Sequence, residues 1–313
     1  MRLVKPPHLR KGDLIGLISP ASPPSSLTAM EAGVRYLEGL GYGVKSGEHA
    51  RAQRGYLAGT DAQRVADLNG MLNDPQVKAI FALRGGYGTP RLLPYVDYDA
   101  ARRQPKILVG HSDLTALQLA LYRCAGLVTF SGPMVASDFG KTPDPYTEEH
   151  FWRLLTSSAR VGFLPNPPQQ PVTGRRPGRA TGRLLGGNLS LLVSGLGTAY
   201  SPSFRGALLV LEDVHEHYHR LDRMLTQLRN AGVFARIKGL VLGQFTRCTP
   251  HNPGEPHLTL KQVFDDVLSW VSGPALQGFQ YGHVAQKLTV PFGLRARLDA
   301  DRGTVEVLEP AVE

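Results

Sequence analysis

One serine of this sequence occupies a position suited to a nucleophile. Ser112 follows a short apolar run, residues 106–110, and opens a helical pattern that extends to Ala125. Where a buried strand turns sharply into a helix, the turn residue lies at the carboxyl end of a sheet and can face a ligand together with helix N–H groups. The sequence Gly-His-Ser-Asp-Leu at 110–114 departs from the Gly-x-Ser-x-Gly elbow. Taken alone, it favours Ser112 as a helix N-cap, with the nucleophile as the alternative.

A glycine-rich segment, Arg-Gly-Gly-Tyr-Gly at 84–88, directly follows an apolar run at 77–83. Glycines at a strand end let the backbone approach a ligand closely and leave N–H groups free to face an anion. A tight turn without a chemical role is the simpler interpretation of such a cluster alone. Arg84 is a candidate for binding a substrate carboxylate, because a guanidinium matches that geometry, and bracing of the loop is the alternative.

Hydrolysis by a serine requires a base near the hydroxyl, an acidic group that orients the base, and N–H donors for the oxyanion. Two residues of the second half offer the missing groups. Glu212 ends an apolar run at 207–211, and His283 lies in a loop at 278–283. A solvated strand end and a surface histidine are the ordinary explanations. Only the fold can bring the two together.

The sequence His-Glu-His-Tyr-His at 215–219 satisfies the His-Glu-x-x-His pattern of zinc peptidases, in which two histidines one helical turn apart bind the metal. Here the pattern follows a strand end directly, and no well-placed third ligand follows close downstream. We therefore interpret His215 and His219 as part of a polar turn and predict no metal and no other cofactor. Metal-dependent hydrolysis remains the alternative.

The composition is that of a folded globular protein with room for two domains: 313 residues, 42% hydrophobic and 19% charged. No apolar run reaches the roughly 18 residues of a membrane span. The run at 14–18 is too short for a signal-peptide core, so we expect a cytoplasmic protein without a membrane contact. Cys124 and Cys248 lie far apart, which argues against a disulfide framework or a cysteine-based zinc site.

The net charge is +9, and the densest basic segment lies at 175–183. That segment lacks interleaved aromatic residues and is rich in proline and glycine. We therefore interpret it as a solvated linker and predict no nucleic-acid partner. The positive charge is compatible with acidic substrates but identifies none.

Apolar runs alternate with helical patterns through the first half of the chain, as in βαβ units with a parallel sheet. There is no P-loop, and no Gly-x-Gly-x-x-Gly follows the first strand. Thr60 begins a capping-box pattern. The predicted strands are 14–20, 42–45, 77–83, 106–110 and 128–131, and the predicted helices follow Ser25 or Ser26, Thr60 and Ser112.

Residues 165–182 are rich in proline, glycine and arginine without periodicity, as in a linker between domains. We predict an α/β fold with a parallel-sheet N-terminal α/β domain at 1–164 and a smaller β-rich, barrel-like domain at 183–313. The elements predicted beyond the linker are a short helix at 186–192, helices at 221–228 and 258–271, strands at 207–211 and 238–243, and a hairpin of 295–299 with 304–308.

Taken in order, several segments resemble the LD-carboxypeptidase family of serine peptidases, which includes the muramoyltetrapeptide carboxypeptidases and the microcin-resistance peptidases. A single motif is weak evidence, but the ordered series is specific and extends over residues 12–299. The matching segments are 12–21, 56–61, 84–88, 110–115, 182–189, 211–214, 221–225 and 282–283.

The resemblance implies a triad in which Ser112 attacks, His283 takes its proton and Glu212 fixes the imidazole tautomer. It also implies an oxyanion hole formed by the backbone N–H groups of Gly86 and Asp113. The nucleophile would lie in the α/β domain, and the glutamate and histidine in the β-rich domain, so that the site lies between them. The resemblance further implies a cytoplasmic homodimer that needs no metal.

The implied reaction is hydrolysis of the amide between an L-configured centre and a C-terminal D-residue through an acyl-enzyme. In the family's main branch this releases D-alanine from murein tetrapeptides, a muropeptide substrate of cell-wall recycling. A microcin-resistance type hydrolase of aminoacyl-nucleotide amides is the second candidate, and a catalytically silent binding protein is the third.

The residue before the serine is often aromatic in this family, and here it is His111, which is a rival base. Adjacent side chains usually point away from each other. We therefore keep His283 as the predicted base, and we assign no role to the histidines at 215–219.

Overall fold

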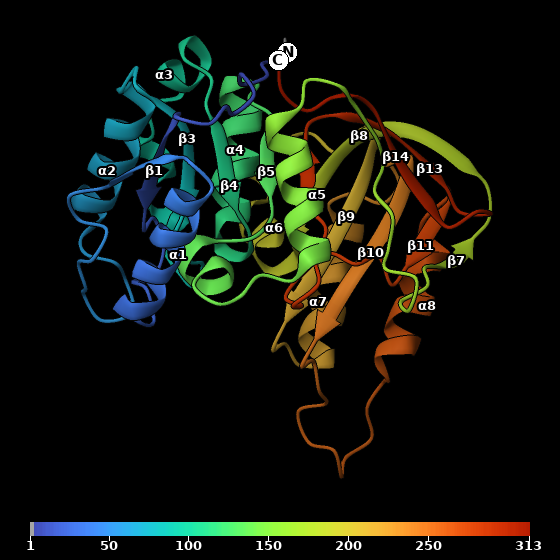
Figure 1. Ribbon diagram of the computed structural model, residues 1–313. Coiled ribbons are helices and arrows are strands. Elements are labelled where there is room, and N and C mark those ends of the chain that lie inside the picture. The colour runs from blue at the N-terminus through green and yellow to red at the C-terminus, as the bar shows by residue number, and fades with distance from the viewer. Residues whose placement is uncertain (1–2) are drawn as a thin grey trace.

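The computed structural model describes residues 3–313 as two β-sheets, each with flanking helices (Figure 1). The first half of the chain supplies most of the six-stranded sheet, and the second half supplies most of the eight-stranded sheet. The two ends of the chain meet, since the His8 backbone N–H donates to Glu313 O. Among residues 3–313, every helix is too short or too polar to cross a lipid bilayer.

The first sheet has the strand order β12-β5-β4-β3-β1-β2, in which β12 pairs antiparallel with β5 and all the other neighbouring strands are parallel. Thr60 and Gln63 form the predicted capping box at the start of α2. The predicted parallel α/β domain is therefore confirmed. Its elements are β1 Leu14–Ile18, α1 Leu27–Gly39, β2 Gly43–Ser46, α2 Asp61–Asn73, β3 Val77–Ala82, α3 Tyr98–Arg103, β4 Ile107–Gly110, α4 Thr115–Ala125, β5 Thr129–Ser131 and α5 Pro145–Thr156.

The second sheet has the order β6-β14-β13-β8-β9-β10-β11-β7, with β8 to β11 parallel in its centre. The predicted hairpin is present as β13 and β14. The remaining elements are β6 Arg160–Phe163, β7 Thr173–Arg176, β8 Arg179–Asn188, α6 Leu189–Gly195, β9 Ala207–Val214, α7 Tyr218–Asn230, β10 Gly239–Thr246, α8 Leu260–Trp270, β11 Ala275–Gln277, β12 Val290–Phe292, β13 Arg295–Asp299 and β14 Thr304–Pro310.

The segment 165–182, predicted to be an aperiodic linker, contains β7 and the first residues of β8. β7 pairs with β11, and β8 lies between β13 and β9. Local periodicity misses these strands because they are rich in arginine and glycine and are held by partners distant in sequence. The chain also crosses between the sheets at β6 and at β12. The domain limits at 164 and 183 stay a prediction.

β12 is the segment by which the second half of the chain joins the first sheet. It pairs antiparallel with β5, in the register Val290 to Ser131 and Phe292 to Thr129. Phe292 is fully buried in the apolar cluster that also contains Phe130. Since β12 follows the loop of His283 by a few residues, its docking fixes where that loop enters the first domain.

Phe292→Ala is expected to lower the free energy of unfolding by about 3–5 kcal/mol, because it removes a buried ring and leaves a cavity. Urea denaturation of the purified variant measures this loss. Phe163→Ala is the control, since Phe163 in β6 is 54% exposed and its loss is expected to change stability by about 0.5 kcal/mol or less. Equal losses for the two variants would contradict the role assigned to β12.

Candidate active site

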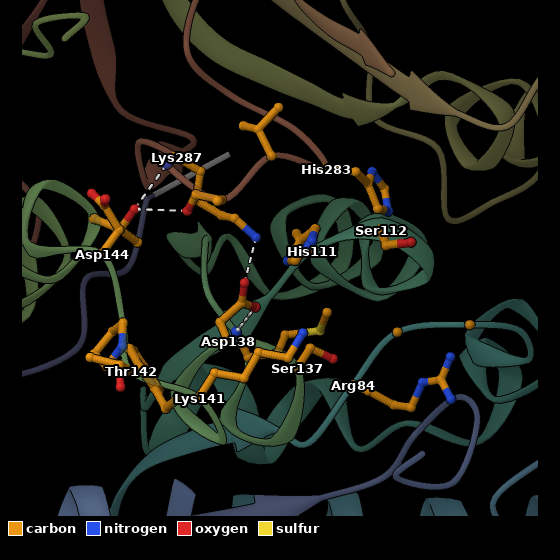
Figure 2. A pocket seen from close by; sticks show the side chains of 18 of the residues that line it. Arg84, His111, Ser112, Ser137, Asp138, Lys141, Thr142, Asp144, His283 and Lys287 are labelled. Carbon is orange, nitrogen blue, oxygen red and sulfur yellow. Dashed lines mark hydrogen bonds and ion pairs between the residues drawn. The ribbon is translucent and has the colours of Figure 1, made fainter. Parts of the chain in front are cut away.

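Ser112 lies in the sharp turn between β4 and α4, with a left-handed backbone (φ 65°). A non-glycine residue with positive φ is strained, and such residues cluster at functional sites. Neither the short 3₁₀ turn Ser112–Leu114 nor α4 has a side-chain N-cap. Ser112 is therefore not the helix cap that its local sequence favours. It is half-buried and lines a cavity of about 760 Å³ (Figure 2).

The glycine loop after β3 packs against this turn, since a Cβ on Gly85 would lie 3.0 Å from Ser112 Cβ. Gly86 has φ 118°, and a Cβ there would lie 2.2 Å from Ser22 Oγ, so the position requires glycine. Within residues 3–313, no protein oxygen accepts a hydrogen bond from the backbone N–H of Gly86 or Asp113. Gly86 also lines the cavity that contains Ser112, and Asp113 is the residue that follows Ser112.

The second sheet contributes a paired imidazole and carboxylate. His283 Nδ1 lies 2.7 Å from Glu212 Oε2, and Glu212, on β9, is 1% exposed. Because the carboxylate accepts, Nδ1 carries the proton and Nε2 is left as an acceptor. Figure 2 shows the His283 ring beside Ser112, and both residues line the same cavity. The fold thus gathers Ser112, Glu212 and His283 from two sheets.

The position of Glu212 is fixed from two further sides. Asn188 Nδ2, at the end of β8, donates to Glu212 Oε1 at 3.2 Å, and the Asn188 backbone N–H donates to Thr115 Oγ1 at 3.0 Å on α4. Gly282 has φ 131°, and a Cβ there would lie 2.9 Å from Glu212 Oε2. A larger residue at 282 would therefore press on the carboxylate that holds His283.

His111, the rival base, is buried and its Nδ1 lies 3.0 Å from Gly132 O. Burial, followed by the nearby positive charge of Lys287, lowers the pKa of His111 to about 3. Its ring packs edge-on against that of His283, with 5.1 Å between the ring centroids. A group with so low a pKa is a weak base at neutral pH, which favours His283 as the base.

The cavity beyond these residues is rich in cationic groups. Lys287 Nζ lies 2.6 Å from Asp138 Oδ1, and the side chain of Lys287 is only 6% exposed (Figure 2). Its basic lining residues are Arg84, Lys141, Arg247 and Lys287, and its acidic ones are Asp138 and Asp144. The excess of positive charge suits a ligand that carries a carboxylate.

Two models of one protein family match the chain, one in each half. Residues 15–132 match the family model described as the LD-carboxypeptidase N-terminal domain, and residues 181–298 match the LD-carboxypeptidase C-terminal domain. The chain belongs to the LD-carboxypeptidase family. It is therefore an enzyme, a hydrolase of the carboxypeptidase class.

The likeness to individual LD-carboxypeptidase relatives extends over nearly the whole chain. A probable murein peptide carboxypeptidase of Bacillus subtilis is 40% identical over 309 residues, which cover 98% of this chain and 95% of the relative. A structure of the microcin C7 self-immunity protein MccF with adenosine monophosphate has a TM-score of 0.91 at 26% identity, covering 99% and 100% of the two chains. A muramoyltetrapeptide carboxypeptidase from Oxalobacter formigenes has a TM-score of 0.84 at 32% identity, covering 96% and 100%.

In this LD-carboxypeptidase the guanidinium of Arg84 has a protein partner. Nη1 donates to Pro23 O at 3.3 Å. This contact supports the bracing alternative. Carboxylate binding by Arg84 stays a prediction.

The His-Glu-x-x-His segment does not form the helix that the zinc pattern requires. α7 begins at Tyr218, so His215 lies outside it, with φ 61°. His215 Nε2 instead lies 3.1 Å from Arg247 Nη1. In the part of the chain that the structure describes, no three His, Cys, Asp or Glu side chains are grouped as metal ligands. The predicted polar turn is therefore present at residues 215–217 only, and the prediction is wrong for Tyr218 and His219, which form the start of α7.

Several residues that complete the site cannot be identified from the sequence. Asn188 lies in a segment that resembles the family, but its contact with Glu212 has no local signal. Asp138 and Lys287 are 149 positions apart, and nothing in the sequence pairs them. Tyr281 precedes His283 by two positions, and nothing in the sequence distinguishes it from other aromatic residues in loops.

His111→Phe is expected to weaken the dependence of the free energy of unfolding on pH below about pH 6.5. Between pH about 3 and 6.5 the unfolded chain binds a proton at this residue that the folded chain excludes, so stability falls as the pH drops through that window. Loss of the histidine lowers the slope of the free energy of unfolding against pH by up to about 1.4 kcal/mol per pH unit. Urea denaturation across the window measures it.

His257→Phe, on an exposed loop, is the control and is expected to leave that slope unchanged. An unchanged slope in His111→Phe would contradict the low pKa of His111.

Proposed function

We propose that this LD-carboxypeptidase is a serine peptidase whose triad is Ser112, His283 and Glu212. The observation that carries the proposal is the contact of 2.7 Å between His283 and Glu212, in the cavity that holds a strained, half-buried serine. The N–H group of Gly86, in the glycine loop after β3, and that of Asp113, in the turn of Ser112, have no acceptor among the described residues, which supports their assignment as the oxyanion hole.

In the proposed reaction, Ser112 Oγ attacks the carbonyl carbon of the scissile amide while its proton passes to His283 Nε2. Glu212 stabilises the imidazolium that forms, and the N–H groups of Gly86 and Asp113 bind the oxyanion. The C–N bond breaks as His283 returns the proton to the leaving amine. Water, deprotonated by His283, then hydrolyses the acyl-Ser112 ester and frees the enzyme.

The proposed substrate is a murein tetrapeptide, cleaved between an L-configured centre and its C-terminal D-alanine. The names of the Bacillus and Oxalobacter relatives, a murein peptide carboxypeptidase and a muramoyltetrapeptide carboxypeptidase, support a murein peptide. The excess of basic residues in the cavity suits a peptide end that carries a carboxylate. Release of D-alanine in cell-wall recycling is the role that we propose for the chain.

Hydrolysis of aminoacyl-nucleotide amides by the same triad is the second candidate. The TM-score of 0.91 to MccF, solved with adenosine monophosphate, supports it. Among the described residues that line the cavity, Phe139 alone is a phenylalanine, tyrosine or tryptophan, and it is 1% exposed, so its ring offers a nucleobase little surface for stacking. This favours the murein substrate.

On the resemblance, we further propose a cytoplasmic homodimer. We propose that it acts on a small peptide without a metal or cofactor, and that it has no nucleic-acid or membrane partner.

The first test is incubation of the purified protein with a disaccharide tetrapeptide ending in D-alanine, with and without EDTA, followed by mass spectrometry. Loss of one alanine, insensitive to EDTA, is expected. Ser112→Ala is expected to lower kcat by at least about 10³. Ser269→Ala, an exposed serine on α8, is the matched control and is expected to retain activity.

Inhibition by EDTA would indicate that hydrolysis depends on a metal ion and would contradict the proposed triad. Inertness toward the tetrapeptide together with cleavage of an aminoacyl-nucleotide amide would select the second candidate. Retention of activity in Ser112→Ala would exclude this serine as the nucleophile.

Arg84→Ala is expected to raise KM for the tetrapeptide about tenfold with little change in kcat, if the guanidinium binds the terminal carboxylate. Steady-state kinetics on the same substrate measure both constants. An unchanged KM with a lower Tm would instead assign Arg84 to bracing the loop through Pro23.

A further inference from the structure

His283 and Ser112 lie on different sheets, so their separation depends on how the loop of His283 is attached. The backbone of this loop is held by the second sheet. The Gln244 N–H donates to Tyr281 O at 2.9 Å, and Thr246 Oγ1 donates to His283 O at 3.3 Å, both from β10. Together with Glu212 on β9, these contacts fix His283 within its own sheet, but none of them reaches Ser112.

The side chain of Tyr281, by contrast, extends to the first sheet. Its hydroxyl lies 2.7 Å from Ser131 Oγ, at the end of β5 in the first sheet. Ser131 is 0% exposed and Tyr281 is 2% exposed, so water does not compete for this hydrogen bond. The Tyr281 ring also packs edge-on against Phe292 of β12, with 6.4 Å between the ring centroids.

The place of Ser131 in the first sheet gives this contact its significance. Ser131 is the strand neighbour of Gly110 in the β4–β5 register. Gly110 precedes Ser112 by two residues, and Tyr281 precedes His283 by two residues. The hydrogen bond therefore links the strand neighbour of Gly110, close to Ser112, with Tyr281, close to His283.

We propose that Tyr281, through Ser131, is a positioning residue that sets the distance between Ser112 and His283 across the two sheets. The inference rests on the proposed function, because it assumes that His283 takes the proton of Ser112. Tyr281 does not touch the reacting atoms. It acts on kcat by holding the imidazole where the serine hydroxyl can reach it.

The test separates positioning from stability by removing the two hydroxyls singly and together. Tyr281→Phe and Ser131→Ala each leave one buried hydroxyl unpaired and are expected to lower Tm, and the double variant removes both and is expected to regain part of the loss. If Tyr281 positions His283, kcat falls about 10- to 100-fold in all three variants, including the double variant, with KM little changed.

The pH profile of kcat/KM is a second readout. Glu212 still holds Nδ1 in these variants, so the midpoint of the profile is expected to stay where it is while the plateau falls. Tyr98→Phe is the matched control, because it removes a half-buried tyrosine hydroxyl that donates to Leu93 O at 2.8 Å, away from the site. It is expected to leave kcat unchanged.

Recovery of wild-type kcat in the double variant would overturn the inference, as would a fall in kcat no greater than that of Tyr98→Phe. If Tyr281→Phe alone does not fold, the double variant decides between the two outcomes. Wild-type protein that neither cleaves the tetrapeptide or an aminoacyl-nucleotide amide nor reacts with a serine-directed phosphonate would instead refute the proposed function. An active wild type with unaffected variants would refute only the role of Tyr281.

Discussion

The arrangement of the site depends on one interaction, the hydrogen bond between the buried Glu212 and the half-buried His283. A carboxylate that is 1% exposed is costly unless it is paired, and removal of a partner from such a pair typically costs about 3–5 kcal/mol. Here the imidazole occupies one oxygen and the amide of Asn188 the other. The requirement to satisfy this charge explains why β8, β9 and the loop of His283 converge, and why residue 282 is a glycine.

The second constraint is that the two sheets must keep a fixed separation. The chain meets it by crossing between them: β6 belongs to the second sheet, and β12 belongs to the first. The crossing at β12 lies just after the loop of His283, and Lys287 in the same segment pairs with Asp138. A loop tied to both sheets is a suitable support for His283, whose proposed role requires contact with Ser112 from the other sheet.

Local strain and charge complete the arrangement. Ser112 adopts a left-handed backbone that a free serine avoids, and the surrounding sheet maintains it. The cavity in front of it is lined by four basic and two acidic residues, which favours an anionic peptide end over a neutral one. The low pKa of His111 keeps a second charge away from the imidazole of His283. These features are consistent with the membership of the chain in the LD-carboxypeptidase family.

The sequence by itself determined the parallel α/β half and the turns at Ser112 and Gly86, because periodicity, glycine and capping signals act over a few residues. It also indicated the family, through the ordered series of motifs over residues 12–299. Only the tertiary structure decided which distant groups meet. β7, β8 and β12 are held by partners far along the chain, and Tyr281 finds Ser131 across 150 positions. Ser112 and His283 share a cavity for the same reason. Such contacts depend on backbone pairing and burial, which have no local period. The sequence therefore named Ser112, Glu212 and His283 but could not place them together.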